Sequence, residues 1–223
     1  TLCIRALDLF ATAAARDIPA SCGAQGKGDC TFPRTGEQED LYDCGPFCRE
    51  DHPLHHESRG MMEEETSLEF HLGGYRTSIV FSSMFPQDSE EQNLLIVQDV
   101  NTAQQFPQLK ERTVVIPSGE GGKSGASVEQ ILDRAFQAGL DRSSLFQGIG
   151  GGVVCDVTAF AASLFMRGSR LRLVPTTLLA MVDAAFGGKT AINFHGWKNM
   201  VGTFYPAEQI WINPRTLESL PKR

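Results

Sequence analysis

One segment in the middle of the chain constrains the fold more than any other. A short apolar run at residues 145–149 is followed directly by Gly150, Gly151 and Gly152. After the glycines, apolar residues recur at the spacing of one helix face, at Val153, Val157, Phe160, Ala161 and Leu164. A strand, a glycine turn and a helix in that order are typical of dinucleotide sites. Glycine lets the backbone approach a pyrophosphate, and the helix N-terminus offers unpaired N–H groups.

The glycine turn does not match the G-x-G-x-x-G fingerprint, so it indicates a nucleotide site without identifying one. We expect Asp156 in the first turn of the helix that follows. A carboxylate at that place either complements the helix dipole or binds a group of a cofactor or substrate. Its position alone does not decide between the two.

The composition fits one or two globular domains with a real core, since 41% of the 223 residues are hydrophobic. The formal net charge of −7 argues against binding to nucleic acid or to a membrane surface. No apolar run approaches the roughly 18 residues that a membrane span needs. We therefore expect neither a nucleic acid nor a membrane as a partner.

Residues 1–60 differ from the rest of the chain. They hold five of the six cysteines and three of the five histidines, and large apolar residues are sparse after Phe10. A zinc site would lack any C-x2-C pair, and a disulfide module would lack a secretory signal. We favour a third interpretation, in which Met61 or Met62 is the natural start. Residues 1–60 are then a poorly structured N-terminal extension, and residues 61–223 form the α/β domain.

From Ser67 onward the chain becomes periodic. Residues 67–72 and 75–81 read as two strands joined by the turn Gly73-Gly74. Further strands are expected at residues 93–97, 113–116, 145–149 and 171–174, with helices between them. This alternation predicts an α/β fold with a Rossmann-like parallel sheet and flanking helices.

Two helices between these strands are expected to pack on the sheet. The first covers residues 127–138, with Ser127 and Gln130 as a capping box and Gly139 as its stop. Its expected inner face holds Val128, Ile131, Leu132, Ala135 and Phe136. The second follows Thr177 and is expected to bury Leu178, Leu179 and Val182.

Polar residues follow several strands at their carboxyl ends, where ligands bind in open α/β sheets. Asp99 and Asn101 follow one strand and Glu120 and Lys123 follow the next, while Thr176 and Thr177 follow a third. Each has a simpler explanation. Asp and Asn form turns, a Glu and a Lys in a loop are usually solvated, and threonine hydroxyls cap helices.

A second group of polar residues follows the threonines. Asp183 comes late in its expected helix, where a negative charge opposes the dipole, and this raises the expectation of a functional role. Lys189, Lys198 and Asn199 lie in a segment with few other charges. Two lysines and an asparagine suit a substrate that carries phosphate and carboxylate groups. The alternative is that both lysines are ordinary surface residues.

The motifs from residue 150 onward resemble those of the 3-dehydroquinate synthases, and more widely of the sugar-phosphate cyclases. The resemblance covers roughly Met62 to Arg223. The motifs that carry it are GGGVVCD at 150–156, FAAS at 160–163, MRG at 166–168, VPTTLLAMVD at 174–183, GGKTAIN at 187–193, KNMVGTFYP at 198–206 and LESLP at 217–221.

The resemblance implies the N-terminal domain of a two-domain enzyme whose helical C-terminal domain is missing here. Such enzymes convert 3-deoxy-arabino-heptulosonate 7-phosphate to 3-dehydroquinate and phosphate in the shikimate pathway. They use NAD transiently and a divalent metal, zinc or cobalt, whose ligands would lie beyond Arg223. The resemblance further implies a cytoplasmic homodimer, with this part inactive alone.

The resemblance also assigns roles to individual residues. Asp183, Lys189 and Asn199 would contact the substrate, and Arg167 would reach the site of a neighbouring subunit. The cofactor would be bound by Asp99, Asn101, Glu120, Lys123, Gly151, Gly152, Val153, Asp156, Thr176, Thr177, Lys198, Thr216, Leu217 and Ser219, with no metal ligand among the residues of this chain.

One residue departs from the family pattern, because Cys155 stands where the family usually has glycine. A cysteine in the first turn of a helix could carry a lowered pKa. The chemistry needs no thiol, so we interpret Cys155 as a tolerated small residue.

Three alternatives to a 3-dehydroquinate synthase stay open. They are a cyclase that makes valiolone- or inosose-type rings, a polyol dehydrogenase of the glycerol-dehydrogenase type, and a non-catalytic NAD-binding fragment. In the last case residues 1–60 would serve as a metal-binding arm.

Overall fold

The computed structural model describes residues 65–72, 74–87, 93–107 and 112–220. These residues all belong to one compact unit. The interpretations given above for residues 1–60 lie outside the described residues.

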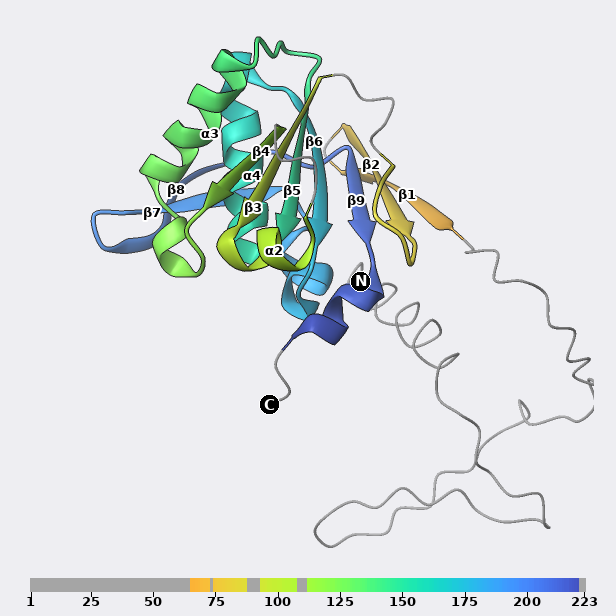
Figure 1. Cartoon of the computed structure of the whole chain (residues 1–223). Coiled ribbons are helices and arrows are strands. Elements are labelled where there is room, and N and C mark those ends of the chain that lie inside the picture. The colour runs from red at the N-terminus through yellow and green to blue at the C-terminus, as the bar shows by residue number, and fades with distance from the viewer. Residues whose placement is uncertain (1–64, 73, 88–92, 108–111, 221–223) are drawn as a thin grey trace, which may run out of the picture. The chain divides into compact units, whose positions relative to one another are not determined.

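The centre of the fold is a seven-stranded sheet with the order β1-β2-β9-β6-β5-β3-β4 (Figure 1). The strands are β1 Thr66–Leu72, β2 Tyr75–Phe81, β3 Leu94–Asp99, β4 Thr113–Ile116, β5 Leu145–Gly150, β6 Arg170–Pro175 and β9 Gln209–Ile212. β1 pairs antiparallel with β2, and every other neighbouring pair is parallel. The α/β prediction with a parallel, Rossmann-like sheet is therefore confirmed.

The central strands are buried on both faces. Leu94 to Val97 on β3 are at most 2% exposed, and every residue of β5 is buried. A continuous apolar run is what a strand covered on both faces requires. This is why the chain gives no alternating pattern at these strands.

Two helices cover one face of this sheet. Helix α3, Gly125–Gln137, lies beside α4, Gly152–Leu164, and α4 packs against β5 and β6. Gly148 on β5 lies beneath α4. A Cβ at Gly148 would lie 2.8 Å from the hydroxyl of Thr158, so the glycine lets the helix approach the strand closely.

A second layer of apolar residues completes the core. Leu94, Ile96, Leu145, Ile149 and Val174 form one buried cluster, and the partly buried rings of Phe85 and Trp211 pack against it. The indole of Trp211 donates a hydrogen bond to the carbonyl of Met84, at 2.7 Å. The segment that follows β2 is thereby tied to β9.

Helix α3 begins earlier than predicted. Its N-cap is Ser124, whose hydroxyl accepts a hydrogen bond from the N–H of Ser127. The predicted N-cap at Ser127 was therefore wrong. Ser124 lies three residues earlier and is also a serine, and it forms the cap instead. Phe136 is 59% exposed instead of facing the sheet, although its ring contacts Phe165. Gly139 ends the helix as predicted, with φ of 66°.

Helix α4 is buried on more sides than one predicted face requires. Val154, Cys155, Thr158 and Ala162 are buried, whereas Leu164 is 46% exposed. The reason is that α4 is covered by the sheet on one side and by a separate hairpin on the other.

That hairpin was missed from the sequence. It consists of β7, Lys189–Phe194, and β8, Trp197–Phe204, paired antiparallel. Gly187 and Gly188 precede it with φ of 78° and 69° and form the expected turn. Every residue of β8 is exposed, so the strand shows no alternation between a core face and a solvent face.

The segment between β6 and the hairpin also differs from prediction. Leu178 and Leu179 are 54% and 69% exposed, and Ala180 and Met181 are the buried residues. Leu178 and Leu179 precede a short π-helix at Ala180–Ala184, to which both buried residues belong. Its wider turn rotates the residues that follow, and such turns are frequent at functional sites.

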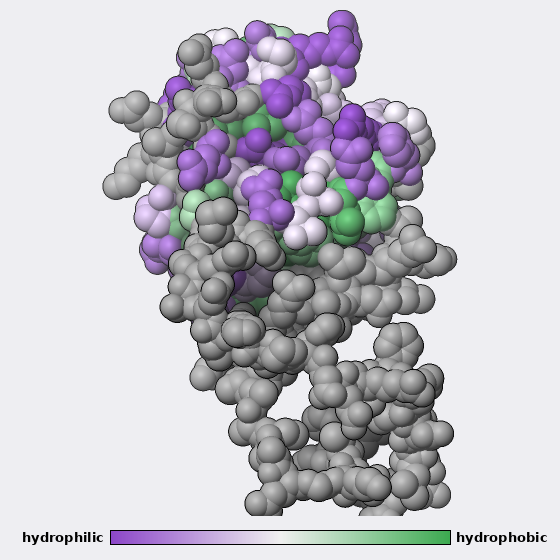
Figure 2. All heavy atoms as spheres, turned by 90° about the vertical axis from the view of Figure 1, so that its right-hand side faces the viewer, coloured by the Kyte–Doolittle hydropathy of each residue, from purple (hydrophilic) through white to green (hydrophobic). Residues whose placement is uncertain are grey.

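The surface that faces the viewer in Figure 2, on the side of β1 and β2, is mostly hydrophilic where it is described, with smaller hydrophobic areas between. Within the described ranges, no helix is long and apolar enough to cross a membrane.

Candidate functional site

The candidate site lies at the carboxyl edge of the parallel strands. β3 and β5 are neighbours in the sheet, but the strands that follow them lie in opposite directions. β4 lies next to β3 toward one edge of the sheet, and β6 lies next to β5 toward the other edge. In open α/β sheets, such a reversal opens a crevice beyond the two strand ends. Asp99 at the end of β3 and Gly150 at the end of β5 flank this place.

The glycine turn leads from β5 into α4 without a capping side chain. Gly151 is the N-cap and provides no side-chain hydrogen bond to the first N–H groups of the helix. The turn is also packed tightly, because a Cβ at Gly150 would lie 2.5 Å from Val154. An uncapped helix N-terminus beside a glycine turn fits an anionic group such as a pyrophosphate. The glycines therefore allow close packing against α4 and leave the first N–H groups of the helix without a side-chain cap.

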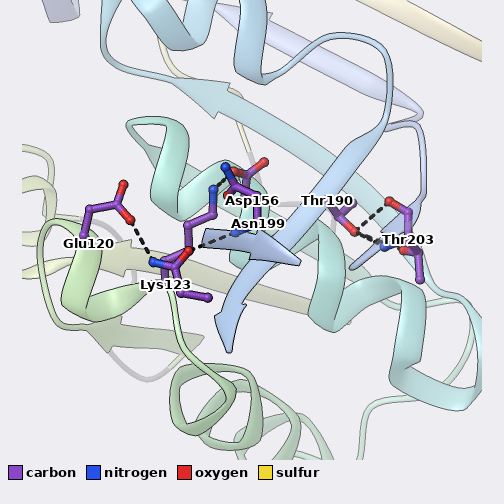
Figure 3. Close-up of polar contacts among 7 residues, drawn as sticks. Glu120, Lys123, Asp156, Thr190, Asn199 and Thr203 are labelled. Carbon is purple, nitrogen blue, oxygen red and sulfur yellow. Dashed lines mark hydrogen bonds and ion pairs between the residues drawn. The ribbon is translucent and has the colours of Figure 1, made fainter. Parts of the chain in front are cut away.

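Two of the predicted cofactor residues form an ion pair. The ammonium of Lys123 is paired with the carboxylate of Asp156, and their side chains are only 8% and 17% exposed (Figure 3). Asp156 is the fifth residue of α4, so the expectation that it lies in the first turn was wrong. Its position suits the ion pair with Lys123 better than complementation of the helix dipole.

The electrostatic surroundings of Asp156 are mixed. Burial raises the pKa of Asp156 above its ordinary value, although the ammonium of Lys123 lowers it. The carboxylates of Glu120 and Asp183 are close enough to raise the pKa further. The carboxylate that pairs with Lys123 therefore has two further acidic groups near it.

A cavity of about 490 Å³ lies between α4, the π-helix and the hairpin. Its walls bring together three predicted substrate residues, Asp183, Lys189 and Asn199, and the predicted cofactor residue Asp156. The full lining is Asp156, Asp183, Ala184, Phe186, Lys189, Thr190, Ala191, Asn199, Met200, Gly202, Thr203 and Phe204.

The hairpin is held by the side chain of Thr190. Its hydroxyl donates a hydrogen bond to the carbonyl of Thr203 and accepts one from the N–H of Thr203, both at 3.0 Å (Figure 3). The Thr203 hydroxyl donates to the Ser163 hydroxyl on α4, at 3.1 Å. At Gly202, a Cβ would lie 1.8 Å from the carbonyl oxygen of Thr190. Close strand contact thus requires glycine there.

Asn193, near the end of β7, was not singled out from the sequence. Its amide donates a hydrogen bond to Glu120 at 2.8 Å, and its Oδ1 accepts one from the N–H of Asn199 at 3.1 Å. The backbone N–H of Asn193 donates to the carbonyl of Lys123, at 2.9 Å. The only signal in the sequence was its place in the GGKTAIN motif.

Glu120 is the acceptor of the first of these bonds. The hydrogen bond from Asn193 lowers the pKa of Glu120, although burial opposes the shift, and the positive charges of Lys198 and Lys123 lower it further. Lys198 is thereby placed near Glu120 without lining the cavity.

Several predicted cofactor residues already have partners within the fold. Asp99 caps helix α2, Val100–Gln105, by accepting from the N–H of Thr102 at 2.8 Å. Thr177 accepts from the N–H of Ala180 at 3.3 Å, which is the capping role considered above. These bonds support the simpler explanation for Asp99 and Thr177.

The remaining predicted residues do not line the cavity. Thr216, Leu217 and Ser219 lie in the 3-10 helix at Pro214–Ser219, where the Thr216 hydroxyl donates to the Asn213 carbonyl at 2.8 Å. Arg167 is exposed at the far end of α4. A helix of 13 residues is about 20 Å long, so Arg167 is that far from the glycine turn.

Cys155 is fully buried, and burial raises the pKa of its thiol to about 12. The alternative of a lowered pKa was therefore wrong, and the thiol fills space beside Gly150. Within the part of the chain that the structure describes, no group of three or more His, Cys, Asp or Glu side chains could hold a metal ion.

Comparison with known proteins identifies similar sequences over this site. Residues 113–223 match the family model described as 3-dehydroquinate synthase N-terminal. The 3-dehydroquinate synthase of Methylacidiphilum infernorum is 39% identical over 165 residues, which cover 74% of this chain and 44% of that protein. The 3-dehydroquinate synthase of Pyrococcus abyssi is 50% identical over 109 residues, which cover 49% of this chain and 32% of that protein. The chain thus spans less than half the length of these relatives.

A solved structure has the same fold. The 2-epi-5-epi-valiolone synthase of Streptomyces hygroscopicus, which has NAD⁺ and Zn²⁺ bound, is 30% identical with a TM-score of 0.58. The match covers 64% of this chain and 44% of that one.

Proposed function

We propose, from the premise that this chain carries the N-terminal domain of the 3-dehydroquinate synthase family, that it is the cofactor- and substrate-binding part of such an enzyme. The complete enzyme would convert 3-deoxy-arabino-heptulosonate 7-phosphate to 3-dehydroquinate and phosphate, in the cytoplasm. This chain by itself is proposed to be inactive. The identity of 39% to a 3-dehydroquinate synthase over 74% of this chain, against 30% to a valiolone synthase over 64% of it, favours this substrate over the other cyclase substrates.

The observation that carries the proposal is the cavity beside the glycine turn. Lys189 and Asn199 line this cavity together with the carboxylates of Asp156 and Asp183. A heptulosonate phosphate offers two anionic groups and several hydroxyls. Lys189 and Asn199 suit an anionic group, and Asp183 suits a hydroxyl, which donates to a carboxylate.

NAD is proposed to bind at the adjoining edge of the sheet. The uncapped N-terminus of α4, with Gly151, Gly152 and Val153, suits the pyrophosphate. Glu120 suits a ribose hydroxyl, because its Oε1 makes no hydrogen bond within the described residues while Oε2 is held by Asn193. NAD, when bound, supplies a hydride acceptor that is restored within the same turnover.

The other proposed cofactor residues surround this edge. Lys123 would keep Asp156 oriented, and Lys198 would stand at the junction between cofactor and substrate. Further contacts are proposed for Asp99, Asn101, Thr176, Thr177, Thr216, Leu217 and Ser219. The caps that Asp99 and Thr177 form are compatible with this role, since within the described residues Oδ2 of Asp99 accepts no hydrogen bond and the Thr177 hydroxyl donates none.

A divalent metal, zinc or cobalt, is proposed for the complete enzyme. The described residues offer no ligand set for it, so we assign this chain no step that involves the metal. We also propose a homodimer in which Arg167 reaches the site of the partner subunit. Its exposed position beyond the C-terminal end of α4, outside the cavity lining, supports this.

The test is an assay of the complete enzyme with the heptulosonate phosphate, catalytic NAD and a divalent metal. We expect phosphate release and a product with the mass of 3-dehydroquinate, without net formation of NADH. Net NADH formation from glycerol would instead identify a polyol dehydrogenase. A carbocyclic product made only from another sugar phosphate would identify one of the related cyclases.

A further inference from the structure

Asn193 contacts the cofactor side and the substrate side of the proposed site at once. Its side-chain amide donates to Glu120, its side-chain oxygen accepts from the N–H of Asn199, and its own N–H donates to the carbonyl of Lys123. Glu120 and Lys123 belong to the loop after β4, and Asn199 belongs to β8. Figure 3 shows Glu120, Lys123 and Asn199 close together on the side of the hairpin next to Asp156.

A break in the hairpin gives Asn193 this freedom. The register between β7 and β8 shifts between Ile192 and Phe194, so Asn193 is left out of the regular pairing. Between the pairs Ile192–Val201 and Phe194–Trp197, β7 has only Asn193, whereas the extra residues of the irregularity lie on β8 at 198–200. Such an irregularity disrupts the regular pairing and can re-aim nearby side chains. Here the N–H of Asn193 donates to the carbonyl of Lys123, in the loop after β4, instead of to β8.

The bond to Asn199 supports an uncommon backbone. Asn199 has φ of 57°, in the left-handed region, which asparagine adopts more often than most residues other than glycine. The side chain of Asn193 accepts the N–H of this residue. The conformation that presents Asn199 to the cavity therefore depends in part on Asn193.

We propose that Asn193 is a positioning residue that couples the NAD loop to the substrate hairpin, so that cofactor and substrate each strengthen the binding of the other. The inference rests on the proposed function for the assignment of Glu120 to NAD and of Asn199 to substrate. Ordering Glu120 on one side of Asn193 orders Asn199 on the other, because both bonds use the same planar amide. Coupling of this kind is reciprocal between the two ligands.

The decisive variants exchange donor and acceptor. In Asn193→Asp, the carboxylate still accepts from Asn199 but no longer donates to Glu120, and it adds a like charge beside Glu120. In the double variant Glu120→Gln/Asn193→Asp, the Gln amide donates to the new carboxylate. The Gln oxygen remains to accept a ribose hydroxyl, so the connection is restored with its direction reversed.

The measurement is calorimetric binding of NAD to the complete enzyme, with and without a phosphonate analogue of the substrate that cannot lose phosphate. The ratio of the two Kd values gives the coupling. We expect Asn193→Asp to raise the Kd for NAD about tenfold or more and to bring the coupling ratio close to one. The double variant should return both values to within a few-fold of the wild type. Asn93→Asp, the same change at an exposed residue before β3, should change neither.

Two results would overturn the inference. One is an unchanged coupling ratio in Asn193→Asp, and the other is a double variant no better than Asn193→Asp, which would indicate a merely structural role. Failure of the proposed function is distinguishable from both. It would appear as a wild-type enzyme that binds NAD but releases no phosphate from the heptulosonate phosphate, whatever Kd values the variants give.

Discussion

The buried ammonium of Lys123 is paired with the carboxylate of Asp156, which lies 33 residues further along the chain on helix α4. This pair joins the loop after β4 to the helix after β5, across the reversal in the sheet. Removing one partner of a buried pair leaves the other charge uncompensated. The pair would therefore make stability and the proposed cofactor binding depend on the same contact.

Replacing Lys123 with Met should lower the free energy of unfolding by about 3 kcal/mol, because Asp156 stays buried without its partner. Urea denaturation measures this. The double variant Lys123→Met/Asp156→Leu removes both charges and should recover most of the loss. Equal stability of wild type and Lys123→Met would contradict a structural role for the pair.

The pH dependence of stability should show a raised pKa for Asp156. Burial raises this pKa above 3.8, against the opposing effect of Lys123. An acid whose pKa is higher in the folded than in the unfolded state contributes most to the free energy of unfolding at low pH. Its contribution is lost as the pH rises from 3.8 through the folded-state pKa.

The variant Asp156→Asn isolates this effect, since other titrating groups are common to both proteins. The free energy of unfolding of the wild type, minus that of the variant, should decrease with rising pH across this window and then stay constant. A difference that increases with pH would show that the pKa is lowered and that the ion pair with Lys123 outweighs burial.

Much of the sheet could be predicted from local patterns. The strand predicted at 113–116 has those bounds in the structure, and the strands predicted at 67–72 and 75–81 pair with each other as expected for a hairpin. These elements could be predicted because a short apolar run or an alternating pattern depends only on the local surroundings of its own residues. The glycine turn after β5 was found in the same way.

The helix faces were harder to predict, because a sequence pattern assumes one buried face. Helix α4 is covered on two sides, and Ala180 and Met181 of the π-helix are buried in place of Leu178 and Leu179. Strand β8 is exposed throughout and gives no apolar alternation. Because the hairpin was not predicted, the sequence pattern could not show that Asn193 connects Glu120 with Asn199.

Deleting residues 1–60 should leave the thermal midpoint within about two degrees, since their sequence offers few large apolar residues to a core. A fall of about ten degrees would correspond to well over 1 kcal/mol of lost stability. Such a fall would show that this segment packs against the α/β domain.

Residues 61–223 alone should bind NAD weakly. Glu120, Lys123, the glycine turn and Thr176 all lie on this domain, so the main proposed contacts are present. The C-terminal half expected from the resemblance would be absent, so affinity should be poor. Calorimetry at millimolar NAD tests this, with circular dichroism to establish that the domain is folded. A folded domain without any binding would count against the proposed cofactor site.

Lys189 provides the sharpest test of the proposed substrate site, because its exposed side chain makes no hydrogen bond or ion pair within the described residues and yet lines the cavity. Lys189→Met keeps the length of the side chain and removes its charge. A charge-assisted hydrogen bond contributes about 1.5–3 kcal/mol, and each 1.36 kcal/mol is about tenfold in rate.

We therefore expect kcat/KM of the complete enzyme to fall by roughly ten- to a few-hundred-fold, with little change in NAD affinity. Asp183→Asn should likewise reduce turnover while the thermal midpoint is preserved. The matched control is Arg215→Met, a loss of charge at an exposed residue outside the cavity, which should be silent. If Lys189→Met turned over the heptulosonate phosphate at the wild-type rate, the substrate would bind elsewhere than between the π-helix and the hairpin. A polyol dehydrogenase would then become the better explanation, because its substrate carries no anionic group for Lys189 to hold.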